Sequence, residues 1–182
     1  MDSEKQLIER ARHHPEAFGQ LYDTYYPKIF GYVFRVTGNY ALAADIVSET
    51  FLKAWLRIGS FKWKGISISS WFFKIATNEL NQYFRKKKYI PSTLSDLSLV
   101  RETNDTLAQM DRLEEFEYIQ KMLQLLPPRY QQVIALRYFE ELSIRDLSEI
   151  LGKKEGTIKS LLSRGLDKLK IMMETAATNG YL

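Results

Sequence analysis

Apolar side chains recur at helical spacing along nearly the whole chain, and strand-like alternation is not sustained for six residues anywhere. Pro15, Pro27 and Pro128 each suit the first turn of a helix, because the backbone N–H groups there have no partner within the helix and proline lacks that N–H. Gly38 and Gly152 mark breaks between helices. The sequence therefore predicts an all-α fold. The expected helices span about 15–25, 27–38, 40–58, 69–88, 115–126, 128–139, 143–151 and 155–174.

A polar, acidic stretch at residues 91–114 interrupts this pattern. It is rich in Ser, Thr, Asp and Asn, and its apolar residues show weak periodicity. It holds 2 Lys/Arg against 5 Asp/Glu, whereas residues 1–90 hold 14 against 8 and residues 115–182 hold 10 against 9. This distribution predicts two small helical domains, 1–90 and 115–182, joined by a flexible acidic linker at 91–114.

Composition excludes several classes of site. The chain has no cysteine, which excludes disulfides, Cys-based zinc sites and thiol catalysis. His13 and His14 would point about 100° apart on a helix, so we interpret them as surface residues and predict no metal, no cofactor and no catalytic residue. No apolar run reaches the roughly 18 residues of a membrane span, and MDSEKQLIER lacks the form of a signal peptide. We expect a cytoplasmic protein.

The segment SWFFKIATNELNQYFRKKK, residues 70–88, predicts an amphipathic helix with a basic face. Most of its aromatic residues fall on one apolar stripe, with Trp71 at the border. The opposite face carries no acid and consists of Lys74, Thr77, Asn78, Asn81, Gln82, Arg85 and Lys88. Amides and cations without carboxylates suit phosphate oxygens and base edges. A preceding loop adds Phe61, Trp63 and Lys64, and aromatic rings beside cations suit single-stranded nucleic acid. The alternative is a solvated basic face.

Residues 142–166, LSIRDLSEILGKKEGTIKSLLSRGL, predict a helix-turn-helix. Gly152 would form the turn, and Ser148 would leave room for the two helices to cross. Apolar Leu147, Leu151, Ile158 and Leu162 would fill the angle between them. The polar side chains that project from the second helix are Lys159, Ser160, Ser163, Arg164 and Asp167. Gly156 and Thr157 would lie near phosphates, because a helix N-terminus favours anions. The alternative is a helical hairpin with no role in DNA binding.

Four segments, in order, resemble the extracytoplasmic-function (ECF) sigma factors of bacterial RNA polymerase. AFGQLYDTYYPKIFGYV is similar to the first helices of that family, and AADIVSETFLKAW to its polymerase-binding helix. SWFFKIATNELNQYFRKKK resembles the helix that reads the promoter minus-10 element. LPPRYQQVIALRYFEELSIRDLSEILGKKEGTIKSLLSRG resembles the C-terminal domain that reads the minus-35 element.

The chain departs from the family pattern at several positions. Ala44 and Ser48 replace an acid and a Gln in the polymerase-binding helix, and Asn81 replaces an Asp. Lys153 replaces an apolar residue after the turn. Leu161 replaces an Arg in the recognition helix, which removes a possible phosphate contact, and Leu161 is expected to extend the core instead. These changes predict an unusual promoter preference.

The resemblance implies a promoter-specificity subunit rather than an enzyme. Its partners would be core RNA polymerase, double-stranded minus-35 DNA and single-stranded minus-10 DNA. An anti-sigma protein is a common further partner in the family. No membrane insertion is expected. The implied polymerase contacts are Asp45, Ile46, Ser48, Glu49 and Phe51. The implied minus-10 contacts are Phe61, Trp63, Lys64, Trp71, Lys74, Asn78, Asn81, Arg85 and Lys88. The implied minus-35 contacts are Gly156, Thr157, Lys159, Ser160, Ser163 and Arg164.

Two other functions remain open from the sequence alone. A stand-alone helix-turn-helix regulator would explain residues 142–166 but not the basic face of 70–88. A metal-dependent nucleic-acid enzyme would need carboxylates that converge, whereas Asp45 and Glu49 have no third acid or His at supporting spacing.

If the chain is a sigma factor, its linker must span the distance between the two promoter elements. Promoter elements roughly 17 base pairs apart lie about 58 Å from each other, and 24 linker residues reach about 80 Å extended but span about 27 Å when relaxed.

Overall fold

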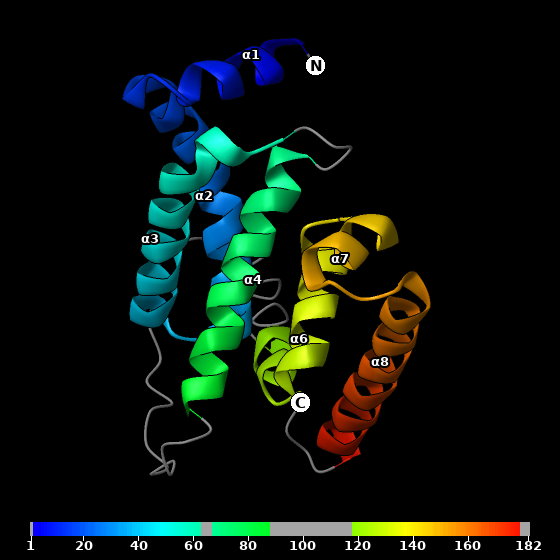
Figure 1. Ribbon diagram of the computed structural model, residues 1–182. Coiled ribbons are helices and arrows are strands. Elements are labelled where there is room, and N and C mark those ends of the chain that lie inside the picture. The colour runs from blue at the N-terminus through cyan, green and yellow to red at the C-terminus, as the bar shows by residue number, and fades with distance from the viewer. Residues whose placement is uncertain (1, 63–66, 88–117, 179–182) are drawn as a thin grey trace, which may run out of the picture.

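The computed structural model describes residues 2–62, 67–87 and 118–178, and every regular element in these ranges is helical (Figure 1). The predicted all-α fold with two domains is therefore confirmed. The first domain contains α1 (Asp2–Ala11), α2 (Pro15–Thr37), α3 (Tyr40–Arg57), the 3-10 turn η1 (Ile58–Ser60) and α4 (Ile68–Lys87). The second contains a helical segment at 118–124, α6 (Pro128–Ile134), the π-helical η2 (Ala135–Phe139), α7 (Ile144–Leu151) and α8 (Glu155–Thr178).

The expected boundary at Pro27 is wrong. The helices predicted at 15–25 and 27–38 are one helix, α2, with Pro27 inside it. An interior proline lacks an N–H donor and ordinarily kinks or breaks a helix. Tyr25 and Ile29 on either side of Pro27 are both buried in the core of the first domain. This packing outweighs the local cost, because tertiary burial supplies most of the stability of a helix in a protein.

Helix α1 is an element that the sequence did not predict. Its few apolar residues give a weak pattern, yet Ile8 and Ala11 are buried against α2. The Tyr25 hydroxyl of α2 donates a hydrogen bond to the Glu4 carboxylate. Burial and this carboxylate both raise the pKa of Tyr25, so its hydroxyl stays protonated. Helix α1 therefore covers one end of the first domain.

Local capping chemistry fixes the turn between α2 and α3. Gly38 adopts a left-handed conformation with φ of 65°, and its N–H donates to the Phe34 carbonyl at 2.8 Å. The Asn39 side chain then accepts from the Leu42 N–H at 2.8 Å and starts α3. The chain thus reverses within two residues, and α3 packs along α2.

The second domain contains the predicted helix-turn-helix. A capping box starts α7, in which Ser143 Oγ accepts from the Asp146 N–H and the Asp146 carboxylate accepts from the Ser143 N–H, both at 3.1 Å. Gly152 forms the turn with φ of 61°. Leu147 and Ile158 are fully buried in the angle between α7 and α8. The helix-turn-helix is therefore held by its own core.

The two domains pack against each other. Helix α4 of the first domain lies beside α7 of the second, and α2 contacts η2 (Figure 1). Within the described ranges, no helix is both long enough and apolar enough to cross a membrane.

Candidate nucleic-acid and partner surfaces

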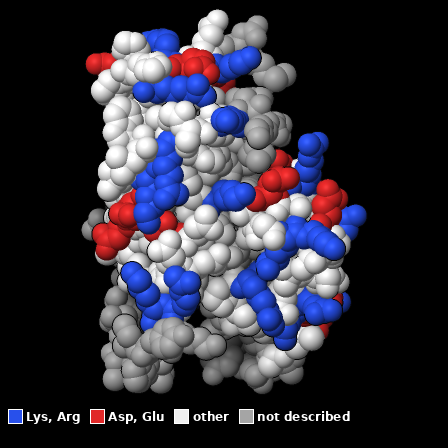
Figure 2. All heavy atoms as spheres, in the orientation of Figure 1, with Lys and Arg blue, Asp and Glu red and all other residues white. Residues whose placement is uncertain are grey.

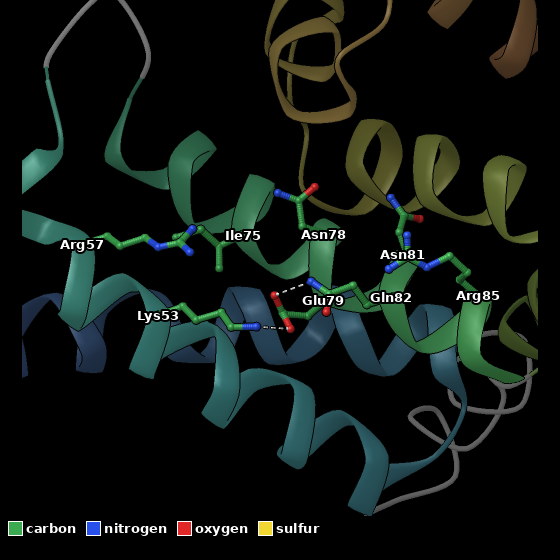
Figure 3. A pocket seen from close by; sticks show the side chains of 8 residues that line it. All are labelled: Lys53, Arg57, Ile75, Asn78, Glu79, Asn81, Gln82 and Arg85. Carbon is green, nitrogen blue, oxygen red and sulfur yellow. Dashed lines mark hydrogen bonds and ion pairs between the residues drawn. The ribbon is translucent and has the colours of Figure 1, made fainter.

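An open pocket of about 460 Å³ lies between α3 and α4 (Figure 3). It lies on the side of α4 that the sequence predicts to contact nucleic acid. Helix α3 contributes Lys53 and Arg57, and α4 contributes Ile75, Asn78, Glu79, Asn81, Gln82 and Arg85. The lining is thus mainly amides and cations, with one apolar wall at Ile75.

Glu79, which does not belong to the polar face defined from the sequence, also lines the pocket. Lys53 Nζ lies 2.7 Å from Glu79 Oε2 and 3.1 Å from Glu49 Oε1. The hydrogen bond to Glu79 raises the pKa of the Lys53 ammonium against the opposing effect of burial. Glu79 is therefore neutralised from α3, a partner that the pattern of α4 alone could not reveal.

Arg57 and Arg85 supply positive charge at the pocket. Both side chains are exposed, and no ion pair between described residues involves either of them. Figure 2 shows Lys and Arg gathered on this face of both domains, with acidic groups between them. Unpaired guanidinium groups beside amides can bind phosphate oxygens while the amides contact a base.

The structure places the predicted minus-10 residues in different environments. Asn78, Asn81 and Arg85 are exposed on α4, and Lys74 is half-buried. The Phe61 ring is only 5% exposed and lies 5.1 Å from the ring of Trp71, which is half-buried. Phe61 and Trp71 therefore pack on each other in this structure. Trp63, Lys64 and Lys88 lie outside the described residues.

The outer face of α3 carries a stripe of exposed residues at helical spacing. Asp45, Ser48 and Glu49 are exposed, as the sequence predicts for a partner surface. Leu52 and Leu56 continue the same face and are 53% and 72% exposed. Exposed large apolar groups beside charges are typical of a protein interface. We call these five residues the α3 outer face.

The other two residues assigned to polymerase binding lie beneath this face. Ile46 and Phe51 are buried, and the Phe51 ring lies 4.7 Å from the Tyr22 ring. They support α3 from within the core. Sequence reasoning missed Leu52 and Leu56, although Leu52 lies three residues after Glu49 and four after Ser48, and Leu56 lies four residues after Leu52.

The recognition helix α8 presents most of its predicted residues to solvent. Gly156, Thr157, Lys159, Ser163 and Arg164 are exposed, and Ser160 is half-buried. Leu161, which replaces an Arg of the family pattern, packs against the hydrophobic core, as the sequence predicts. On the other side of α8, Gly165 closely approaches α6: a Cβ atom there would lie 3.1 Å from Ile134 Cδ1. The polar side of α8 is therefore available to a ligand while its apolar side packs on α6.

Comparison with known proteins accounts for both domains. The model for "Sigma-70 region 2" matches residues 21–89, and that for "Sigma-70, region 4" matches residues 116–169. The ECF RNA polymerase sigma factor SigW of Bacillus subtilis is 32% identical over 165 residues, covering 85% of this chain and 88% of SigW. The ECF RNA polymerase sigma factor BldN of Streptomyces coelicolor is 30% identical over 171 residues, covering 90% of this chain and 63% of BldN.

Solved structures share the fold at lower identity. CnrH in complex with the cytosolic domain of CnrY matches with a TM-score of 0.71 and 20% identity, covering 94% of this chain and 97% of the other. The sigma factor RpoE in complex with the anti-sigma factor NepR from Bartonella quintana matches with a TM-score of 0.69 and 24% identity, covering 86% and 96%.

Two sigma-70 regions in order, on a pair of helical domains, define a promoter-recognition subunit of bacterial RNA polymerase. Within that class, the chain belongs to the ECF sigma factors. It therefore acts by binding core polymerase and promoter DNA, and it is not an enzyme. Membership of this family excludes the two alternative functions, a stand-alone helix-turn-helix regulator and a metal-dependent nucleic-acid enzyme.

Proposed function

We propose that residues 1–90 bind core polymerase and the minus-10 element, that residues 115–182 bind the minus-35 element, and that residues 91–114 link the two domains. The support is that each domain carries its own exposed polar or basic surface. The chain would act in the cytoplasm, where it meets polymerase and DNA.

The pocket between α3 and α4 would hold an extruded base of the melted minus-10 strand. Ile75 offers an apolar wall, while Asn78 and Gln82 can both donate and accept hydrogen bonds to a base edge. Arg57 and Arg85 would hold the adjoining phosphates. The observation that carries this assignment is the presence, beside these amides in one open pocket, of two guanidinium groups that form no ion pair with another described residue.

The α3 outer face would bind core polymerase. Asp45 and Glu49 would provide charge, and Leu52 and Leu56 would lose their exposed apolar surface to the partner. Ile46 and Phe51 would hold the helix in position from the core. Leu56 is 72% exposed against 53% for Leu52, so it has more apolar surface to lose and is expected to be the main apolar contact.

The recognition helix α8 would enter the major groove of the minus-35 duplex. Lys159, Ser163 and Arg164 would face base edges or phosphates, with Ser160 beside them. Gly156 and Thr157 would lie at the phosphate backbone. An anti-sigma protein would regulate the chain, a proposal supported by the RpoE–NepR complex among its structural neighbours.

Run-off transcription with core polymerase on genomic fragments tests the minus-10 assignment. Asn78→Ala should change which promoter fragments are used, because its amide contacts a base. Arg85→Ala should weaken all promoters and reduce the salt slope by about one, because its guanidinium contacts phosphate. Arg10→Ala, an exposed residue on α1, is the matched control. If Arg85→Ala behaved like Arg10→Ala, the pocket would not be the DNA site.

Co-elution with core polymerase tests the α3 outer face. Leu56→Asp should abolish co-elution while leaving helical content unchanged, because the side chain is 72% exposed. Leu125→Asp, at a residue that is 66% exposed in the second domain, is the matched control. Equal co-elution of both variants would exclude α3 as the polymerase contact.

A further inference from the structure

Arg12, in the turn that joins α1 to α2, contacts a segment 49 residues further along the chain. Its Nη2 donates a hydrogen bond to the Phe61 carbonyl at 2.6 Å. Its Nη1 forms an ion pair with Glu9 Oε2 of α1 at 3.0 Å. Figure 1 shows that α1 lies across the end of the first domain at which α3 ends and α4 begins. Arg12 therefore ties the N-terminal helix to the segment between α3 and α4.

The Arg12 side chain is partly withdrawn from water. It is 26% exposed, and its Nε is buried without a hydrogen-bond partner among the described residues. A buried donor without a partner lowers stability, so the contacts of the other two nitrogens must compensate for it. A hydrogen bond from a cation to a carbonyl is stronger than one between neutral groups. The contact with Phe61 is therefore a stronger restraint than an ion pair on the surface would be.

Phe61 passes this restraint on to Trp71 of α4. The Phe61 N–H donates to the Ile58 carbonyl at 3.1 Å and closes η1. Its backbone is thus held at the N–H from within η1 and at the carbonyl by Arg12. Its ring is 5% exposed and lies 5.1 Å from the ring of Trp71, which is half-buried. Arg12, Phe61 and Trp71 therefore form a continuous series of contacts from α1 to α4.

This series joins α1 to two aromatic residues of the proposed minus-10 surface. Arg12 precedes the residues matched to sigma-70 region 2, which begin at residue 21, whereas Phe61 and Trp71 lie within them. A base that stacks on an aromatic ring binds more tightly when the ring is already held in place, because less side-chain freedom is lost on binding. A restraint on Trp71 from α1 would therefore increase affinity for the melted strand.

We propose that Arg12 is a positioning residue for minus-10 recognition: it fixes the Phe61 backbone and, through the Phe61 ring, holds the Trp71 ring ready to stack on a promoter base. The inference rests on the proposed function, because it takes Trp71 as part of the minus-10 surface. Arg12 acts without touching DNA. Its role differs from that of Arg85, whose guanidinium would bind phosphate directly.

Three variants of the full chain isolate this role. Arg12→Met removes the guanidinium and retains the apolar stem of the side chain. Arg12→Lys keeps the charge and a donor for the Phe61 carbonyl, so it should preserve most of the restraint. Arg10→Met, at an exposed residue of α1, is the matched control, because it makes the same change in net charge away from Phe61.

The fluorescence anisotropy of Trp71 reports its mobility without DNA or polymerase. Replacing Trp55 and Trp63 by Phe leaves Trp71 as the one tryptophan of the chain. In that background we expect lower anisotropy in Arg12→Met than in Arg10→Met, and recovery in Arg12→Lys. Equal anisotropy in Arg12→Met and Arg10→Met, at equal helical content, would overturn the restraint of Trp71 by Arg12.

Binding of a fluorescein-labelled single-stranded oligonucleotide to the holoenzyme, with all three tryptophans in place, gives the functional readout. The oligonucleotide carries the minus-10 sequence of a promoter used in run-off transcription. Arg12→Met should bind it about three- to tenfold more weakly than Arg10→Met, because the aromatic rings must be ordered on binding. Co-elution with core polymerase should be unchanged, whereas misfolding of the first domain would reduce both.

Phe61→Leu is the second variant if Arg12→Met loses helical content. It removes the ring contact with Trp71 and leaves the carbonyl in place, so it should weaken oligonucleotide binding to the same extent. Unchanged affinity in Phe61→Leu would overturn the route through Phe61. Equal affinity in Arg12→Met and Arg10→Met, with weaker binding in Arg85→Ala, would overturn the positioning role alone. Unchanged affinity in Arg85→Ala as well would overturn the minus-10 surface itself, and the positioning role with it.

Discussion

Replacing Lys53 by Met removes the cation that neutralises Glu79 in the pocket. Glu79 has a side chain only 10% exposed, and Lys53 Nζ lies 2.7 Å from its Oε2. After the substitution, the Glu79 carboxylate would keep the 3.3 Å hydrogen bond from Gln82 but no positive partner at that position. The first domain should lose stability, because a desolvated carboxylate would remain unpaired.

The expected loss is about 2 kcal/mol. An unsatisfied buried polar group costs about 1–3 kcal/mol, and breaking a fully buried ion pair costs about 3–5 kcal/mol. Lys53 is 27% exposed and the pocket is open on one side, so water can reach part of the site and the lower range applies. For a domain of this size, the loss corresponds to a fall in Tm of about 8–16 °C.

Tryptophan fluorescence during thermal unfolding measures this effect on the first domain alone. All three tryptophans, at positions 55, 63 and 71, precede the linker. Lys53→Met/Glu79→Gln should return to within about 0.5 kcal/mol of the wild type, because the remaining group is neutral. Glu49→Gln removes the exposed partner of Lys53 and should change stability by less than about 0.5 kcal/mol. Equal losses in Lys53→Met and the double variant would refute the coupling of Lys53 to Glu79.

Three other outcomes follow from the structure. Burial raises the pKa of Glu140, so the folded chain binds a proton at Glu140 more readily than the unfolded chain does. The free energy of unfolding should therefore gain a contribution as pH falls from neutrality, and Glu140→Gln should remove that contribution. Gly165→Ala should lower the free energy of unfolding by about 1 kcal/mol in urea titrations, because its Cβ would lie 3.1 Å from Ile134 Cδ1. Gly156→Ala is the control: its Cβ would enter open space, so it should not lower the free energy of unfolding. Arg164→Ala should relax sequence preference at one minus-35 position and cost about 1–3 kcal/mol in binding assays if it contacts a guanine edge; a uniform loss would indicate a phosphate contact.

Local chemistry made the helix ends predictable. Gly38 and Gly152 adopt the left-handed conformations that glycine tolerates, and Ser143 with Asp146, three residues later, forms a capping box. These features depend on residues within a few positions of each other. Pro27 was misinterpreted because its effect depends on burial of the whole of α2, which no local pattern contains.

The candidate site was predictable only on one helix at a time. The spacing of Asn78, Asn81 and Arg85 identified the polar side of α4. The opposite wall of the pocket comes from Lys53 and Arg57 on α3, and a single helical pattern does not show which helix lies beside it. Contacts between the domains were equally hidden, because they join residues that no common periodicity relates.

The order of contacts along the chain also sets the order of events during synthesis. The tight turn at Gly38 and Asn39 lets α2 and α3 pair as soon as both leave the ribosome, and α4 follows directly. Gln132, however, is made 51 residues after Asn81. At about 5–20 residues per second, this delay is roughly 3–10 s. Every newly made chain therefore passes through a period in which Asn81 has been made and Gln132 has not, so the Asn81 amide on nascent chains is free to meet polymerase and nucleic acid before the second domain contacts it through Gln132.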